Sequence, residues 1–397
     1  MNSQSYGYLA ALLVSLLGSS LSMLALPWFL LEVTGDVKYT AVILGVRLLP
    51  VSLSLFYGVK YIDRYSKKTI CVLSDLISAL LVFAIPALYS VSILNVGILV
   101  LLICALTAVE QVNHAGLGAM VPDILKETSI PNERLNGIIG SLHNFGDLVG
   151  PPLAGLIIAL AGSTVALVLD GITFVVSSCI LFFFIKCIPV ASLRDDQESA
   201  LDGLKEAFSF IFRHPQTRYV VIPSVLVNFL IIPLLSLILP YLAKTSFNSA
   251  IDLGFMISAF GCGALLSSMI FTTVGERLSK SWLLIVCTLT LSFCFLLAIF
   301  AGNVYVVMVL LFFVGLSVGL MGPLDDTILQ TNVPEHIRGR VFLVYSSLRF
   351  VTIPLAMVLF GFLLDATSIA NTFAFMAASL GISLVWLLAN RKACEAV

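Results

Sequence analysis

The sequence predicts an all-α integral membrane protein whose twelve transmembrane helices form two pseudo-symmetric six-helix bundles. Hydrophobic residues make up 59% of its 397 residues and charged residues only 11%, whereas a soluble domain needs more polar surface. The mean hydropathy is +1.08, and apolar runs long enough to cross a hydrocarbon core of ~30 Å follow one another along nearly the whole chain. Inside lipid the backbone must satisfy its own hydrogen bonds, so we expect these runs to be helices.

The predicted crossings are even in number, which leaves both termini on the same side of the membrane. They span residues 7–31, 40–62, 69–92, 96–121, 136–161, 164–186, 219–242, 249–272, 282–301, 304–324, 341–364 and 369–390. Arg47 and Arg349 fall inside spans, and only Lys38 and Lys244 lie on the side reached after the first crossing. The remaining Lys and Arg residues lie on the opposite side, so the positive-inside rule predicts that both termini are cytoplasmic.

One long polar interruption divides the chain into two halves of six spans. The predicted parts are an N-terminal bundle, a cytoplasmic linker and a C-terminal bundle, at 1–186, 187–218 and 219–397. Within the linker, residues 201–212 carry apolar side chains, among them Phe208 and Ile211, opposite charged ones. This pattern predicts an amphipathic surface helix.

The two halves repeat each other's loops and prolines. Asp63-Arg64-Tyr65-Ser66-Lys67 follows the second span, and Glu276-Arg277-Leu278-Ser279-Lys280 follows the eighth. Pro131 and Pro151 have the same separation as Pro334 and Pro354. Internal duplication of this kind predicts a two-bundle transporter with its binding site near the bilayer midplane.

Four segments resemble the major facilitator superfamily. Gly58-Val-Lys-Tyr-Ile-Asp-Arg-Tyr-Ser-Lys-Lys68 is similar to the signature between helices 2 and 3, although its first Gly lies one residue too far upstream and Ser66 replaces a Gly. Gly146-Asp-Leu-Val-Gly-Pro-Pro-Leu-Ala-Gly155 resembles the helix-5 signature of exporters. Segments 121–136 and 333–342 resemble the subgroup that contains the enterobactin exporter and macrolide efflux proteins.

This resemblance implies the major facilitator fold and alternating access, in which two bundles rock about a central cavity. It also implies a conformational latch that holds the outward-open state, built from Asp63, Arg64, Lys67, Lys68 and Asp75. The alternative is that the basic residues only keep this loop in the cytoplasm.

The export motif in the fifth span is rich in residues that bend helices or allow close approach. Its members are Gly146, Gly150, Pro151, Pro152 and Gly155. They let the helix bend and a neighbouring backbone come near. The alternative is that they form only a tight packing face, as small residues do in most membrane helices.

Ionisable groups within spans are costly, so each one indicates a functional site. Glu110 and His114 in span 4 are spaced i,i+4, as are His143 and Asp147 in span 5. Counted outward from the connecting turn, the two pairs lie at nearly equal depth. Proton coupling through these four residues, or contact with substrate, is the favoured interpretation. Polar contacts that only join the two helices, or a metal site, are the alternatives.

Other polar groups are candidates for the substrate cavity. They are Arg47, Arg349, Asn113, Asn144, Asn228 and Tyr345. Arg47 needs a partner, such as a carboxylate, or faces an anionic substrate. Arg349 either projects into the cavity or forms a structural ion pair.

Asp170 is expected to cap or pair locally. Apart from Asp252 at the edge of the eighth span, the acidic groups within the predicted spans all fall in the first half. Relatives in the subgroup often have an Arg near the middle of helix 4, where this chain has Glu110 and Gln111.

The sequence therefore predicts a secondary active transporter of a bacterial cytoplasmic (inner) membrane. We expect proton-coupled efflux of an amphipathic small molecule, a drug or a siderophore, by a monomer in the lipid bilayer. An uptake symporter for an organic anion or metal chelate is the alternative, and a non-transporting scaffold or sensor is a third class. No catalytic, Walker or resident metal motif rises above background, and no cofactor or nucleic-acid partner is expected.

Overall fold

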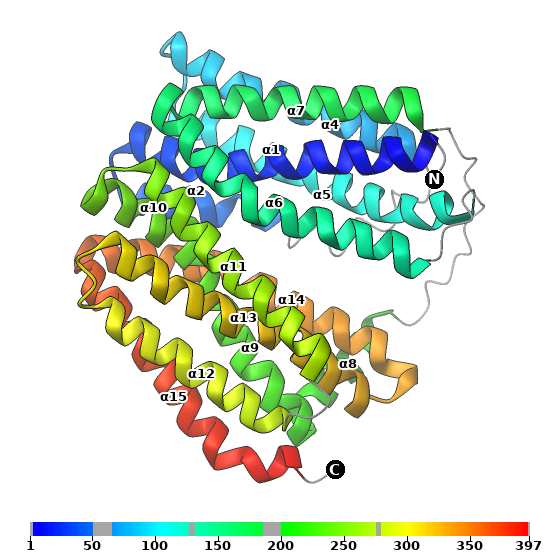
Figure 1. Cartoon of the computed structure of the whole chain (residues 1–397), viewed down its shortest axis with the longest axis vertical. Coiled ribbons are helices and arrows are strands. Elements are labelled where there is room, and N and C mark those ends of the chain that lie inside the picture. Colours follow the sequence, from blue (N-terminus) through cyan, green and yellow to red (C-terminus); the bar gives the residue numbers. More distant parts are fainter. Residues whose placement is uncertain (1–2, 51–65, 127–131, 186–199, 275–278, 396–397) are drawn as a thin grey trace. The chain divides into compact units, whose positions relative to one another are not determined.

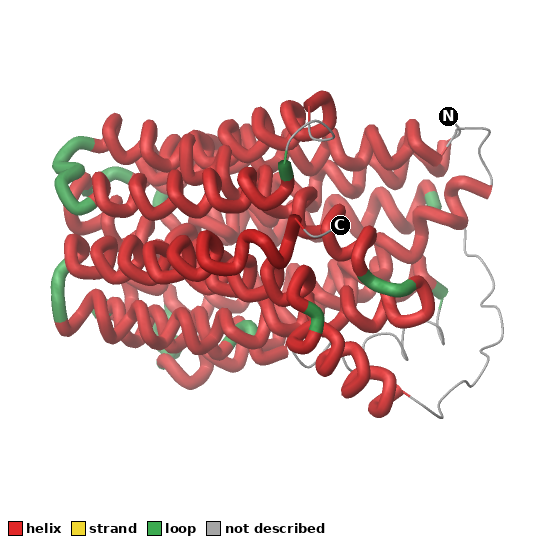
Figure 2. The backbone as a smooth tube through the Cα atoms, turned by 90° about the horizontal axis from the view of Figure 1, so that it is seen from below, coloured by secondary structure: helices red, strands yellow, loops and turns green. Residues whose placement is uncertain are grey.

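A computed structural model describes residues 3–50, 66–126, 132–185, 200–274 and 279–395. Figure 2 shows helices joined by short loops throughout this part of the chain. Eleven of the described helices are long and apolar enough to cross a membrane. The predicted second span, 40–62, is described only as far as residue 50, so the count of twelve crossings stays a prediction.

The chain folds as two compact units. Unit 1 comprises Met1–Asp195 with Ala243–Gly254, and unit 2 comprises Asp196–Leu242 with Phe255–Val397. The boundary after residue 195 falls within the long polar interruption of the sequence, and the short stretch Ala243–Gly254 belongs to unit 1.

Six helices account for most of the described part of unit 1 (Figure 1). They are α1 (Ser3–Thr34), α2 (Val37–Val46), α4 (Lys67–Ser90), α5 (Val96–Lys126), α6 (Asn132–Ala161) and α7 (Ser163–Phe184). Helix α1 packs against α6 and α7, whereas α4 packs against α5 and α7. Gly162 has a φ of +90° at the turn between α6 and α7, a backbone conformation that glycine adopts without steric cost. The apolar core at one end of the unit includes Tyr8, whose hydroxyl donates to the Leu117 carbonyl at 3.2 Å.

Unit 2 contains the helices of the second half. The elements are α8 (Ala200–Arg213), α9 (Pro215–Pro233), η1 (Leu234–Ile238), α10 (Leu239–Leu242), α11 (Ala250–Val274), α12 (Lys280–Ala298), α13 (Val304–Asn332), α14 (Glu335–Ala366) and α15 (Ile369–Glu395). Helix α12 packs against α13 and α15, and α9 packs against α13, α14 and α15. The first residues of α11 belong to unit 1.

The seventh predicted span is one continuous helical segment, 215–247, that contains two π-helical turns. These turns are η1 and η2 (Ala243–Phe247). Pro233 ends the regular helix α9, and Pro240 follows η1. Because proline cannot donate its backbone hydrogen bond, the helix widens locally rather than keeping regular α geometry.

The predicted surface helix is present as α8, but its buried face differs from the expected one. Ala207 and Ile211 are fully buried in the core of unit 2, whereas Phe208 is 49% exposed. Ala207 and Ile211 are spaced i,i+4 and therefore lie on one face of α8. The small side chain of Ala207 lets this face approach α14 and α9 closely. Glu206 of α8 also pairs with Arg340 of α14 at 3.6 Å.

Candidate functional site

Arg47 has a carboxylate neighbour in unit 1. It lies half-buried at the end of α2, and its charge interacts with that of Glu110 on α5. Glu110 also interacts electrostatically with Asp170 on α7. Three helices thus contribute one basic and two acidic groups to the same region. A carboxylate beside Arg47 is one of the two environments that the sequence predicted for it.

Asp170 is fully buried and held by hydroxyl groups. Ser22 of α1 donates to it, and Thr173, one helical turn further along α7, donates at 3.4 Å. These bonds join α7 to α1 and compensate for part of the cost of burying a carboxyl group. The sequence predicted that Asp170 pairs locally. The bond from Thr173 is such a local contact, whereas the bond from Ser22 of α1 was not predicted.

The four predicted proton-coupling residues have different neighbours in the structure. His143 of α6 interacts electrostatically with His114 of α5 and with Asp147 of its own helix. These three side chains are exposed, whereas Glu110 is half-buried and interacts with Arg47 and Asp170. Within the described residues, no group of three or more His, Cys, Asp or Glu side chains is arranged to hold a metal ion.

Two members of the predicted latch, Lys68 and Asp75, contact neighbouring helices of unit 1. Lys68 donates to the Phe182 carbonyl of α7 at 2.7 Å, and its ammonium group lies 5.0 Å from the centre of the Phe182 ring. Asp75 is fully buried and accepts a hydrogen bond from Asn113 of α5, itself only 4% exposed. These contacts join α4 to α5 and α7.

Three of the predicted residues fall where no contact can be given. Asp63 and Arg64 of the latch lie outside the described residues. The side chain of Asn144, a predicted cavity residue, also lies outside the described part.

The export motif of α6 lies against two neighbouring segments of unit 1. A Cβ atom on Gly150 would lie 2.2 Å from the Ser20 hydroxyl of α1, and Ser20 donates to the Gly146 carbonyl at 3.3 Å. On the other side, a Cβ on Gly155 would lie 2.5 Å from the Ala250 carbonyl at the start of α11. Glycine at these positions therefore allows two helix backbones to approach α6 closely.

Predicted cavity residues meet in unit 2, together with groups that the sequence did not indicate. With its amide turned so that the oxygen faces the guanidinium group, Asn228 of α9 accepts from Nη2 of Arg349 in α14 at 3.2 Å and donates to the Arg349 carbonyl at 3.1 Å. The Arg349 guanidinium lies 5.5 Å from the centre of the Tyr345 ring. Tyr345 donates to Asp325 of α13 at 2.9 Å.

The expectation that the acidic groups within spans all fall in the first half was wrong. Asp325 and Asp326 lie inside α13, which continues to Asn332 rather than ending near residue 324. The predicted span ended directly before this charged pair, although ionisable groups do occur within membrane helices where they have partners. Ile328 and Leu329 are both buried. These apolar residues follow the Asp pair at helical spacing, and this pattern could have indicated that the helix continues beyond the pair.

A second group that the sequence did not indicate lies in unit 1. The indole of Trp28 donates to Glu32 at 2.7 Å, and Ser163 at the start of α7 also donates to Glu32. Lys244 of η2 lies 5.8 Å from the centre of the Trp28 ring and interacts electrostatically with Glu32. The end of α1, the start of α7 and the residues of η2 thus meet in one polar cluster.

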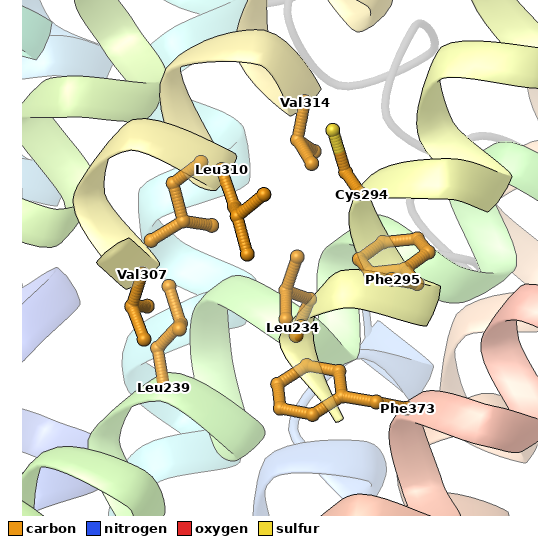
Figure 3. Close-up of a pocket in the computed structure, with 10 residues that line it drawn as sticks. Leu234, Leu239, Cys294, Phe295, Val307, Leu310, Val314 and Phe373 are labelled. Atoms are coloured by element: carbon orange, nitrogen blue, oxygen red, sulfur yellow. The ribbon is translucent and has the colours of Figure 1, made fainter. Parts of the chain in front are cut away.

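One pocket in unit 2 is apolar and contains none of the predicted cavity residues. Its lining comprises Leu234 of η1, Leu239 of α10, Cys294 and Phe295 of α12, residues of α13 and Phe373 of α15 (Figure 3). Its lining offers dispersion contacts but no charged group.

Comparison with known proteins places the whole chain among transporters. Residues 7–395 match the family model described as transmembrane secretion effector. The multidrug efflux pump Tap of Mycolicibacterium fortuitum is 26% identical over 378 residues, covering 94% of this chain and 91% of that protein. The Tap pump of Mycobacterium tuberculosis is 24% identical over 396 residues, covering 96% and 92%.

Solved structures agree on the fold. The nucleoside transporter NupG has a TM-score of 0.79 at 12% identity, covering 99% of this chain and 100% of that chain. A bacterial homologue of the human lysosomal transporter Spinster has a TM-score of 0.73 at 13% identity, covering 99% and 96%. The narrower resemblance to the enterobactin exporter and macrolide efflux proteins stays a prediction. The chain belongs to the transmembrane secretion effector family of the major facilitator superfamily, whose members are multi-pass membrane transporters and not enzymes.

Proposed function

We propose that this protein exports an amphipathic small molecule, such as a drug or a siderophore, in exchange for protons. It works as a monomer in the cytoplasmic membrane of a bacterium, with both termini in the cytoplasm and without a cofactor. The Tap relatives, named as multidrug efflux pumps, support the direction of transport. Export against a gradient needs an energy source, and the ionisable groups within the helices are the candidates for it.

The observation that carries proton coupling is the position of Asp147. This carboxyl group lies within the candidate span Ile138–Ala161, is exposed on its helix and interacts with His143. An ionisable side chain at this depth faces a water-filled path or the bundle interior, because facing lipid costs several kcal/mol, about 2.5 or more. Asp147 can therefore exchange a proton with water, and His143 can relay it to His114.

Alternating access gives the proton its direction. In the outward-open state Asp147 takes a proton from the outside, and in the inward-open state it releases the proton to the cytoplasm. A neutral carboxyl group crosses between states at far lower electrostatic cost than an anion. The predicted latch and the closely packed export motif are the parts of unit 1 that we assign to this conformational change.

Transport into everted membrane vesicles tests this function. Respiration acidifies the lumen, so an exporter accumulates ethidium, an amphipathic cation, inside the vesicles. We expect accumulation above that of vesicles without the protein, and its loss when nigericin collapses the pH gradient. Asp147→Asn should abolish accumulation, whereas Asp365→Asn, the same change at an exposed residue near the end of α14, should not.

Two results would reject the proposal. Accumulation that survives nigericin would exclude the pH gradient as the energy source. Accumulation of an organic anion or metal chelate by intact cells on expression would favour the uptake symporter, with Arg349 as the group that binds the negative charge.

A further inference from the structure

A carboxyl-containing cluster in unit 2 has no role in the cycle described so far. Asp325 lies within the candidate span Val304–Asn332 and is only 2% exposed. A carboxyl group buried in a membrane helix is too costly to be retained without partners. Its partners therefore indicate what it does.

The hydrogen bonds to Asp325 reach only one of its two oxygens. Ser224 of α9 and Tyr345 of α14 both donate to Oδ2, the latter at 2.9 Å. The other oxygen, Oδ1, is buried and has no hydrogen-bond partner within the described residues. The two hydroxyl groups can hold Oδ2 whether the carboxyl is charged or neutral, and Oδ1 is the atom that remains available to gain a proton.

Arg349 provides the positive charge that the ionised form of Asp325 needs. Its charge interacts with both Asp325 and Asp326, and its Nε has no hydrogen-bond partner in the described part of the chain. Asn228 and the Tyr345 ring hold the guanidinium group in place. With one arginine and two carboxylates, this cluster carries a net negative charge until one proton binds.

We propose that Asp325 is a proton-exchanging residue of unit 2, with Ser224 and Tyr345 as its fixed donors and Arg349 as its counter-ion. The other titratable groups that face it are Asp326 of its own helix and Cys287 of α12. This proposal deepens the proton coupling proposed above and rests on it for its role in transport. It places a second proton site in the half where the sequence indicated none.

Infrared titration of the full-length protein in lipid tests the site without a substrate. Protonated carboxyl groups absorb apart from carboxylates, so raising the pH removes their band. In the wild type, we expect the difference between the spectra at low and high pH to contain a band from one titrating carboxyl group per chain. Asp325→Asn should lack this component, and Asp365→Asn should retain it. Arg349→Gln should make this component persist to higher pH, because the ionised form has lost its counter-ion.

Identical titrations of the wild type and Asp325→Asn would overturn the proposal. If Asp325→Asn does not fold, Tyr345→Phe and Arg349→Gln still test it, since each leaves the carboxyl in place. Failure of both variants to move any component would also overturn it. If the wild type shows no transport driven by a pH gradient but the component is present, the proposed function fails and the proton site remains.

Discussion

Gly150 of α6 lies directly against Ser20 of α1. A Cβ at Gly150 would come within 2.2 Å of the Ser20 hydroxyl, whereas a Cβ at Gly140 in the same helix would meet nothing within 4 Å. Gly150→Ala should therefore lower the apparent unfolding midpoint in detergent, with an overpacking cost of about 1–3 kcal/mol.

Gly140→Ala is the matched control for this prediction. It should leave the midpoint unchanged or raise it, because alanine favours a helix over glycine by about 1 kcal/mol. Equal stability of the two variants would show that the approach of α1 and α6 does not require glycine.

Arg47 and Glu110 should depend on each other for stability. Arg47→Gln leaves Glu110 beside Asp170 with no counter-charge, so we expect it to destabilise the protein strongly in the wild-type background. In the Glu110→Gln background the same change should cost less, by a coupling energy of about 0.5–3 kcal/mol. Thermal unfolding of the two single variants and the double variant measures this coupling, and additive losses would refute it.

Asn113 should stabilise the buried carboxyl of Asp75. Asn113→Leu removes the donor and leaves Asp75 buried without it, at a cost of about 1–3 kcal/mol. In the Asp75→Asn background the loss should be smaller, because a neutral amide is less costly to leave unsatisfied than a carboxylate. Unfolding midpoints of the four proteins test this, and an equal loss in both backgrounds would contradict it.

Trp28 should stabilise Glu32 through its indole N–H. Trp28→Phe removes that donor but keeps an aromatic face for Lys244, so we expect a loss of about 1–2 kcal/mol. Trp282→Phe is the control, because Trp282 is 45% exposed and its ring faces Arg391 at 3.9 Å. A Trp28→Phe protein with the midpoint of the control would show that the bond to Glu32 contributes nothing.

The sequence predicted the helical class and most of the crossings because long apolar runs leave a chain in lipid few alternatives. It also identified Arg349, Tyr345 and Asn228, which the structure brings together. It missed Asp325 because the predicted span ended at residue 324, directly before the Asp325–Asp326 pair. Sequence spacing gives the face of one helix but not the helix that packs against it, so it could not show which groups surround Glu110. Glu110 lies instead with Arg47 and Asp170, on α2 and α7.

The most direct test of the account is whether substrate movement and proton movement are coupled through Asp147. Proteoliposomes enclose a pH-sensitive dye together with ethidium, and the pH is initially the same inside and outside. They are diluted into buffer without ethidium, so that ethidium flows out. Because coupling is reciprocal, outflow of ethidium should carry protons the other way and shift the internal pH. We predict this shift for the wild type and for Asp365→Asn, and none for Asp147→Asn. Ethidium flux with no pH change in the wild type, or an undiminished pH change in Asp147→Asn, would contradict the account.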